Sequence, residues 1–139
     1  MMMGSLIAGL SFSHSDVASV HCMAEALGSL YDLPHGLCNS IILPFVMREN
    51  LPYAKIKYAR IARALGRNEN DDELCGRLGI EKIESISLDI GLPSFKSLTI
   101  NENDFDLLAE LSYKNGSNDS NPKPMKQEDY KRLFTLMNS

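Results

Sequence analysis

The chain has 139 residues, of which 44% are hydrophobic and 23% are charged, and its formal net charge is -4. This composition is that of an ordinary globular protein, and the length suits one domain with a core of its own. The acidic balance, without a block of Lys and Arg on one face, excludes nucleic acid and anionic membrane surfaces as partners.

The three cysteines, Cys22, Cys38 and Cys75, are scattered and form no C-x-x-C motif. An odd, unpatterned set of this kind indicates reduced thiols in a cytoplasmic protein. The first residues, MMMGSLIAGLSFS, carry no basic segment and do not resemble a signal peptide. No stretch approaches the roughly 18 apolar residues of a membrane span, so we expect a cytoplasmic protein without membrane contact.

The first helix is predicted over residues 4–12, where small and apolar side chains suit close packing against neighbours. We interpret it as half of a buried helix whose earlier half is missing. Residues 13–16 break it, and Asp16 is expected to cap the next helix by accepting hydrogen bonds from its free N–H groups. The second helix, residues 16–30, carries one apolar face made of Val17, Val20, Ala24, Leu27 and Tyr31.

The second helix also carries His21 and Glu25, which are four residues apart and therefore stack on one side. A neutral imidazole is a good ligand for Zn, Fe or Ni ions. The alternative is that Glu25 accepts a hydrogen bond from His21 and the pair has no further role. Spacing alone leaves both interpretations open.

A turn follows at Leu33-Pro34-His35-Gly36. Pro34 fixes the approach of the chain and Gly36 allows close backbone contact, so the His35 imidazole is expected at the start of the following helix. Two histidines on consecutive helices could converge on one metal ion, although two ligands do not fill a coordination sphere. From the turn alone, a surface histidine is the simpler interpretation of His35.

The third helix, residues 37–47, is apolar nearly all round and should therefore lie in a core. Pro44 should kink or divide it, and Asn50 should end it before Pro52. An amphipathic helix is then expected over residues 53–65, with Gly66 as its C-terminal cap.

A longer helix is predicted over residues 70–91, and its acidic start complements the helix dipole better than it suggests a metal site. Gly79 is expected to weaken or divide it, and its apolar positions are Leu74, Leu78, Ile83, Ile86 and Ile90. Two more amphipathic helices are expected on either side of a polar loop at 114–124. The helix over residues 103–113 has Phe105, Leu108, Ala109 and Ser112 at helical spacing, and the helix over residues 127–137 has Tyr130, Leu133, Phe134 and Met137 on one face. Because no alternating strand pattern and no internal repeat is present, the predicted fold class is all-α.

Three motifs occur in a characteristic order. They are G-[LIM]-x-F-S at Gly9–Ser13, H-x-M-A-x-x-L-G-x-x-Y-x-x-P-H-G at His21–Gly36 and N-x-I-x-L-P-x-V-M-x-x-N at Asn39–Asn50. Their order and spacing resemble the iron-containing (group III) alcohol dehydrogenases. The likeness continues more thinly through KYARIARALG, D-I-G-L-P at Asp89–Pro93 and N-P-K-P-M-x-x-E-D-Y at Asn121–Tyr130. It corresponds to the C-terminal domain of that family, a helical bundle of the dehydroquinate synthase-like α type.

The resemblance implies that His21 and His35 bind the catalytic divalent metal, Fe2+ or Zn2+. In the family, an Asp and another His from an upstream helix complete the ligand set. Glu25 occupies a position where most members have a further His near the nicotinamide, so it is a candidate catalytic residue whose proton-relay role this departure puts in doubt. The complete enzyme would use NAD(P) and a small alcohol or aldehyde, and no NAD(P)-binding residue is assigned in this chain.

We therefore expect residues 1–139 to form a single, partial, metal-binding helical domain, with the N-terminal dinucleotide-binding domain absent. Such a chain should have no appreciable dehydrogenase activity by itself, because a metal held by two protein ligands is weakly bound. Two alternatives stay open. One is a half-enzyme that needs a complementing N-terminal chain. The other is a non-enzymatic helical module that self-associates or binds another protein through an exposed apolar surface, expected at MMMGSLIAGL.

Overall fold

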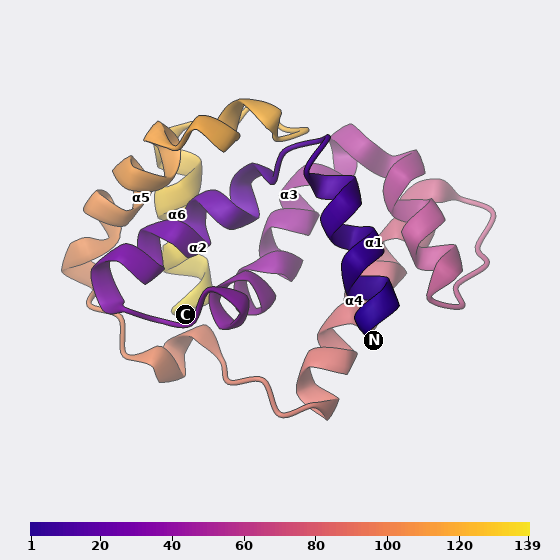
Figure 1. The fold of residues 1–139 in the computed structure, drawn as a ribbon, viewed down its shortest axis with the longest axis horizontal. Coiled ribbons are helices and arrows are strands. Elements are labelled where there is room, and N and C mark those ends of the chain that lie inside the picture. The colour runs from indigo at the N-terminus through magenta and orange to yellow at the C-terminus, as the bar shows by residue number, and fades with distance from the viewer.

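The computed structural model describes residues 1–139 and is helical throughout, with no β-strand (Figure 1). The α-helices are α1 (Met2–Phe12), α2 (Ala18–Tyr31), α3 (His35–Ala64), α4 (Asp72–Asp89), α5 (Phe105–Lys114) and α6 (Gln127–Met137). Short 3₁₀ helices lie in the connections: η1 (Phe95–Leu98), η2 (Glu102–Asp104) and η3 (Gly116–Ser120). The all-α prediction is confirmed. None of the helices is both long enough and apolar enough to span a membrane.

The main core lies between α2, the first half of α3, α5 and α6. The predicted apolar faces of the last two helices are confirmed, since Phe105, Leu108, Ala109 and Ser112 of α5 and Tyr130, Leu133, Phe134 and Met137 of α6 are all buried. Phe95 of η1 joins them, and the rings of Phe95, Phe105 and Phe134 lie 5.9–6.5 Å apart between centroids. These are contact distances for aromatic pairs, so the cluster ties η1 to α5 and α6.

Helices α3 and α4 pack through small residues. A Cβ placed on Gly79 would lie 2.6 Å from the Cβ of Ala62 in α3, so the two helices touch where the glycine has no side chain. The prediction that Gly79 divides the helix is therefore wrong. The predicted apolar face of α4 is confirmed only at Ile83, which packs against buried core residues. Leu74, Ile86 and Ile90 are exposed, and the buried residues of α4 are Cys75, Gly76, Gly79 and Ile80. Close approach of two helices favours small side chains, which a hydrophobic pattern does not identify.

Helix α3 passes through Pro44 without a break, although we expected a kink or division there. Pro44 is one of the buried residues of α3, and the backbone around it keeps helical φ and ψ angles although proline offers no N–H to the helix. The predicted helix end at Asn50 is likewise wrong. The chain leaves helical geometry at Ala54 (φ -140°, ψ 30°), two residues after Pro52. Gly66, at φ +90°, follows the end of α3 as predicted.

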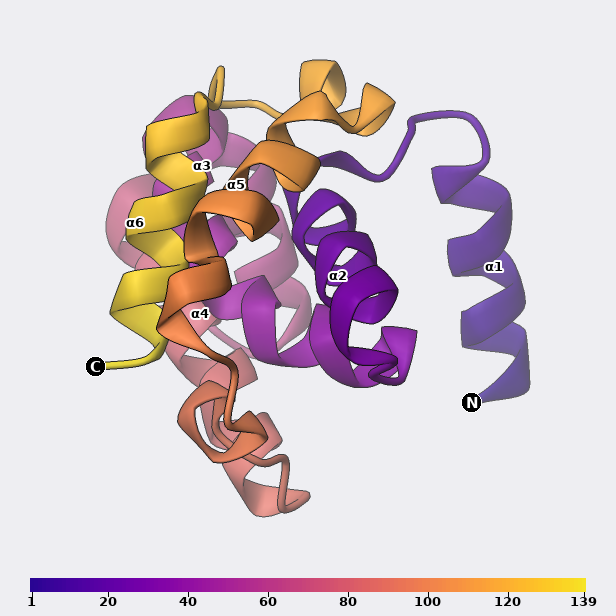
Figure 2. The same cartoon turned by 90° about the vertical axis from the view of Figure 1, so that its left-hand side faces the viewer.

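Helix α1 stands beside the other helices (Figure 2), and none of its residues is buried. The prediction of a closely packed, buried helix is wrong for this chain. Leu6, Ile7, Leu10 and Phe12 are each 53–60% exposed, so the predicted apolar surface at MMMGSLIAGL is confirmed. The helix presents apolar side chains with nothing of this chain covering them.

Helix α2 begins at Ala18, and Asp16 does not cap it in the predicted way. Asp16 has a positive φ of 63°. Its Oδ1 atom accepts hydrogen bonds from the Val17 backbone N–H and from the Ser117 hydroxyl, both at 2.7 Å. The Ser117 and Val17 bonds lower the pKa of Asp16. Asp16 thus joins the start of α2 to η3 and leaves the first turn of the helix without a side-chain cap.

Candidate metal centre

The structure brings His21 and His35 together, with their ring centroids 5.1 Å apart and their planes inclined by 55°. His21 lies in the first turns of α2, and His35 is the first residue of α3. Asp32, in the left-handed conformation at φ 51°, ends α2. The chain then runs back along that helix, and the Leu33 carbonyl passes 3.6 Å from the place where Gly28 would carry a Cβ. This return path explains how two residues 14 positions apart meet.

The two imidazoles differ in their surroundings. His35 is exposed, as expected for a residue at the start of a helix, whereas His21 is half-buried. The Nδ1 atom of His21 is buried and has no hydrogen-bond partner. Burial and the neighbouring His35 lower the pKa of His21, against the opposing effects of the Val17 carbonyl and Glu25. A lowered pKa favours the neutral imidazole, which is the form that binds metal ions.

Glu25 is exposed, and its Oε2 atom accepts a hydrogen bond from the side-chain amide of Asn115 at 2.6 Å. No hydrogen bond joins Glu25 to His21, so the simple pairing considered from the sequence is wrong. The contact with Asn115 instead connects this part of α2 to the residue that precedes η3. The carboxylate nevertheless stays one helical turn from His21, within its electrostatic influence.

No third candidate ligand joins His21 and His35, since the structure contains no group of three or more His, Cys, Asp or Glu side chains that could hold a metal ion. The three cysteines are buried and free. Burial raises the pKa of the Cys22 thiol to about 11 and also raises that of Cys38. Thiols with a raised pKa are poor metal ligands, because the thiolate is the coordinating form.

Sequence reasoning missed Asn39, which lies beside the histidine pair. A pocket of about 300 Å³ is lined by Val17, Val20, His21, Asn39, Ser40 and Leu43. The Oδ1 atom of Asn39 is buried in the structure and has no hydrogen-bond partner. The available signal was its position four residues after His35, which places both on one side of α3.

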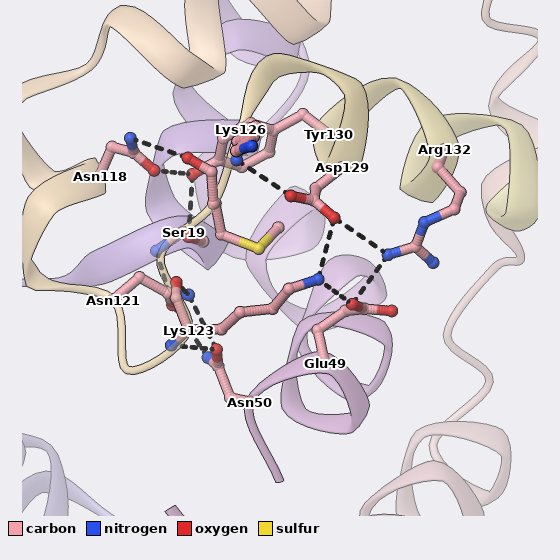
Figure 3. A network of polar contacts seen from close by, with 11 residues as sticks. Ser19, Glu49, Asn50, Asn118, Asn121, Lys123, Lys126, Asp129, Tyr130 and Arg132 are labelled. Carbon is pink, nitrogen blue, oxygen red and sulfur yellow. Dashed lines mark hydrogen bonds and ion pairs between the residues drawn. The ribbon is translucent and has the colours of Figure 1, made fainter. Parts of the chain in front are cut away.

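A polar network holds the start of α2 in place (Figure 3). The Ser19 hydroxyl, two residues before His21, lies 2.8 Å from the Tyr130 hydroxyl, which in turn donates to Asn118 Oδ1 at 2.6 Å. Tyr130 is fully buried in the core, and its burial, as the largest cause, raises its pKa. The turn that carries His21 is thereby fixed to α6 and η3.

The network continues through two buried asparagines. Asn121 exchanges two hydrogen bonds with Asn50 of α3, at 2.8 and 2.9 Å, and donates a third to the Lys123 carbonyl at 2.7 Å. The Lys123 ammonium bridges Glu49 at 2.6 Å and Asp129 at 2.9 Å, and Arg132 reaches Glu49 at 2.8 Å. The N-P-K-P segment therefore serves to join α3 to α6, a role that its spacing did not reveal.

Comparison with known proteins places this geometry in a family. Residues 1–137 match the C-terminal part of the Fe-containing alcohol dehydrogenase family. The chain is 39% identical to the 1,3-propanediol dehydrogenase of Citrobacter freundii over 139 residues, covering 96% of this chain and 35% of that protein. It is 31% identical to the lactaldehyde reductase of Escherichia coli K12, covering 96% of this chain and 36% of that protein.

Solved structures agree with these matches. A crystal structure of 1,3-propanediol oxidoreductase superposes with a TM-score of 0.92 at 36% identity, covering 96% of this chain and 36% of that one. An alcohol dehydrogenase from Oenococcus oeni gives a TM-score of 0.88 at 35% identity, with coverages of 93% and 34%. The chain therefore spans about a third of the length of the relatives it matches, and it belongs to the iron-containing alcohol dehydrogenase family, whose C-terminal helical domain it represents.

Proposed function

We propose that this chain is the metal-binding part of a metal-dependent, NAD(P)-linked alcohol dehydrogenase or aldehyde reductase, and that His21 and His35 bind the catalytic metal. The observation that carries the proposal is the 5.1 Å approach of the two imidazoles. The names of the relatives, 1,3-propanediol dehydrogenase and lactaldehyde reductase, support a small alcohol or aldehyde as substrate. One relative is named an NAD-dependent methanol dehydrogenase, which supports the nicotinamide cofactor.

The residues present fit a divalent metal such as Fe2+ or Zn2+. Imidazole nitrogen is a suitable ligand for both ions, and the surroundings of His21 favour its neutral form. A metal ion bound there would supply a Lewis acid that polarises the substrate oxygen. The role of His21 and His35 is to hold that ion and to fix its place against the end of α2. We expect the remaining ligands to come from other residues of the complete enzyme or from water.

The dinucleotide is proposed to bind outside these residues, which form no sheet. We therefore expect the 139-residue chain to be inactive alone and to work with a dinucleotide-binding domain, either in one polypeptide or as a separate chain. Glu25 remains a candidate catalytic residue, because its exposed carboxylate lies one turn from His21 and could exchange protons near the substrate. The three free cysteines support a reducing, cytoplasmic location.

The proposal is tested in a chimera in which this chain replaces the matching C-terminal third of the Citrobacter freundii 1,3-propanediol dehydrogenase. We expect NAD-dependent oxidation of 1,3-propanediol, with a loss of at least about 100-fold on His21→Gln or His35→Gln. His14→Gln is the matched control, because His14 is exposed and lies outside the pair. An active chimera that tolerates both substitutions would contradict the assignment of the two ligands.

A second candidate function rests on α1. Its uncovered apolar side chains are those of a protein-binding surface, so the chain is also a candidate for a non-enzymatic helical module that self-associates or binds another protein. The chimera separates the two functions: an inactive but folded chimera, together with a stable assembly of the 139-residue chain, would favour the module.

A further inference from the structure

Two residues that line the pocket between α2 and α3 each carry a buried polar atom without a partner, His21 Nδ1 and Asn39 Oδ1. We propose that Asn39 is a positioning residue, whose side-chain oxygen accepts a hydrogen bond from His21 Nδ1–H after a side-chain rotation. This bond would select the tautomer of His21 that leaves the lone pair of Nε2 free for a metal. The inference rests on the proposed function for its purpose, although the hydrogen bond itself can be measured without metal.

The two atoms are chemically complementary. The carboxamide oxygen of Asn39 is an acceptor only, and Nδ1 of a neutral imidazole is a donor in one of its two tautomers. A buried polar atom without a hydrogen bond is unfavourable, so pairing these two would remove two such atoms at once. Metal-binding histidines commonly donate their other ring N–H to an oxygen in this manner, which fixes both the tautomer and the ring orientation.

The surroundings of the pocket favour Asn39 over its neighbours. Val17, Val20 and Leu43 contribute aliphatic side chains, and the Ser40 hydroxyl already donates to the Gly36 carbonyl at 2.8 Å. Asn39 lies one turn after His35 on α3, so the same helix would bear one metal ligand and the group that orients the other. The competing acceptor is the Val17 carbonyl, which belongs to the residue four positions, or about one helical turn, before His21.

The test measures the His21 tautomer in the metal-free, 139-residue chain by long-range 1H–15N NMR. At about pH 8.5 an imidazole is almost entirely neutral, so the spectrum reports which nitrogen carries the proton. We expect the Nδ1–H form to predominate, and Asn39→Leu to reduce the ratio of Nδ1–H to Nε2–H by roughly fivefold, the effect of one ordinary hydrogen bond. Asn39→Asp, which keeps an acceptor oxygen at that position, should restore the preference.

Ser40→Ala is the matched control and should leave the tautomer ratio unchanged. If Asn39→Leu does not fold, Asn39→Ala removes the carboxamide without adding bulk and gives the same comparison. An unchanged ratio in the folded variant would overturn the proposal and would leave the Val17 carbonyl as the acceptor. Because no metal and no turnover enter this measurement, its failure would not affect the ligand assignment, which the activity of the chimera tests separately.

Discussion

Asn121 provides a quantitative test of the network that joins α3 to α6. Its side chain is 7% exposed and makes three short hydrogen bonds, two with Asn50 and one with the Lys123 carbonyl. In Asn121→Leu the side chain keeps the same number of heavy atoms but has no polar atom, so the Asn50 amide N–H and the Lys123 carbonyl lose their partners. Each unsatisfied buried group costs about 1–3 kcal/mol, and we expect a total loss of about 3–4 kcal/mol in the free energy of unfolding.

The assay is urea unfolding of the full chain followed by circular dichroism, with Asn68→Leu as the control. Asn68 is exposed and makes no side-chain hydrogen bond in the structure, so its substitution should change the free energy of unfolding by less than about 0.5 kcal/mol. In the double variant Asn50→Leu/Asn121→Leu no asparagine is left without its partner, and part of the loss should be recovered. A loss below about 1 kcal/mol in Asn121→Leu would refute the reasoning, because two buried polar groups cannot be orphaned at so small a cost.

Three further predictions follow from other parts of the molecule. Gly79→Ala should destabilise the chain by about 1–2 kcal/mol in urea unfolding, because the new Cβ would lie 2.6 Å from the Cβ of Ala62 in α3. Gly28→Ala is the control: its new Cβ would make only an ordinary contact, so the substitution should be neutral or stabilising by up to about 1 kcal/mol. The hydrogen bond from Arg132 is the main cause that lowers the pKa of Glu49 below its ordinary value of 4.5. The ionised Glu49 therefore contributes its full share to the free energy of unfolding above that value, and this share is lost as the pH falls through the lower pKa of the folded state. Glu49→Gln should flatten the fall of stability between about pH 5 and pH 3, and an unchanged slope would show that this carboxyl does not contribute. Leu10→Glu, at a 60% exposed position of α1, should convert a self-associating chain to a monomer in analytical ultracentrifugation, and a wild-type chain that is already monomeric at high concentration would contradict this.

The sequence predicted the parts of the fold that depend on apolar periodicity. The buried faces of α5 and α6 were identified residue by residue, since each helix packs one apolar stripe on the core. The buried face of α4 was missed, because Gly76 and Gly79 are buried by close helix contact and carry no hydrophobic signal. The composition of α1 could not show whether the helix is exposed or buried, because a core helix and an interface helix are equally apolar.

The candidate site was predicted only in part. The motifs that contain His21 and His35 indicated both as candidate ligands, and the structure brings the two rings together. Asn39 was not identified, because its importance depends on a pocket formed between two helices and on an oxygen left without a partner. The contact between Glu25 and Asn115 joins residues 90 positions apart, and no local pattern in either segment indicates it.

The metal content of the purified chimera tests the ligand assignment most directly. Iron and zinc would be determined by inductively coupled plasma mass spectrometry after dialysis against a weak chelator, for the chimera and for its His21→Ala, His35→Ala and His14→Ala variants. We predict close to one metal ion per chain in the chimera and in His14→Ala, and a loss of at least about tenfold in each of the other two. Full metal content in His21→Ala or His35→Ala would contradict the assignment, because it would show that other residues bind the ion.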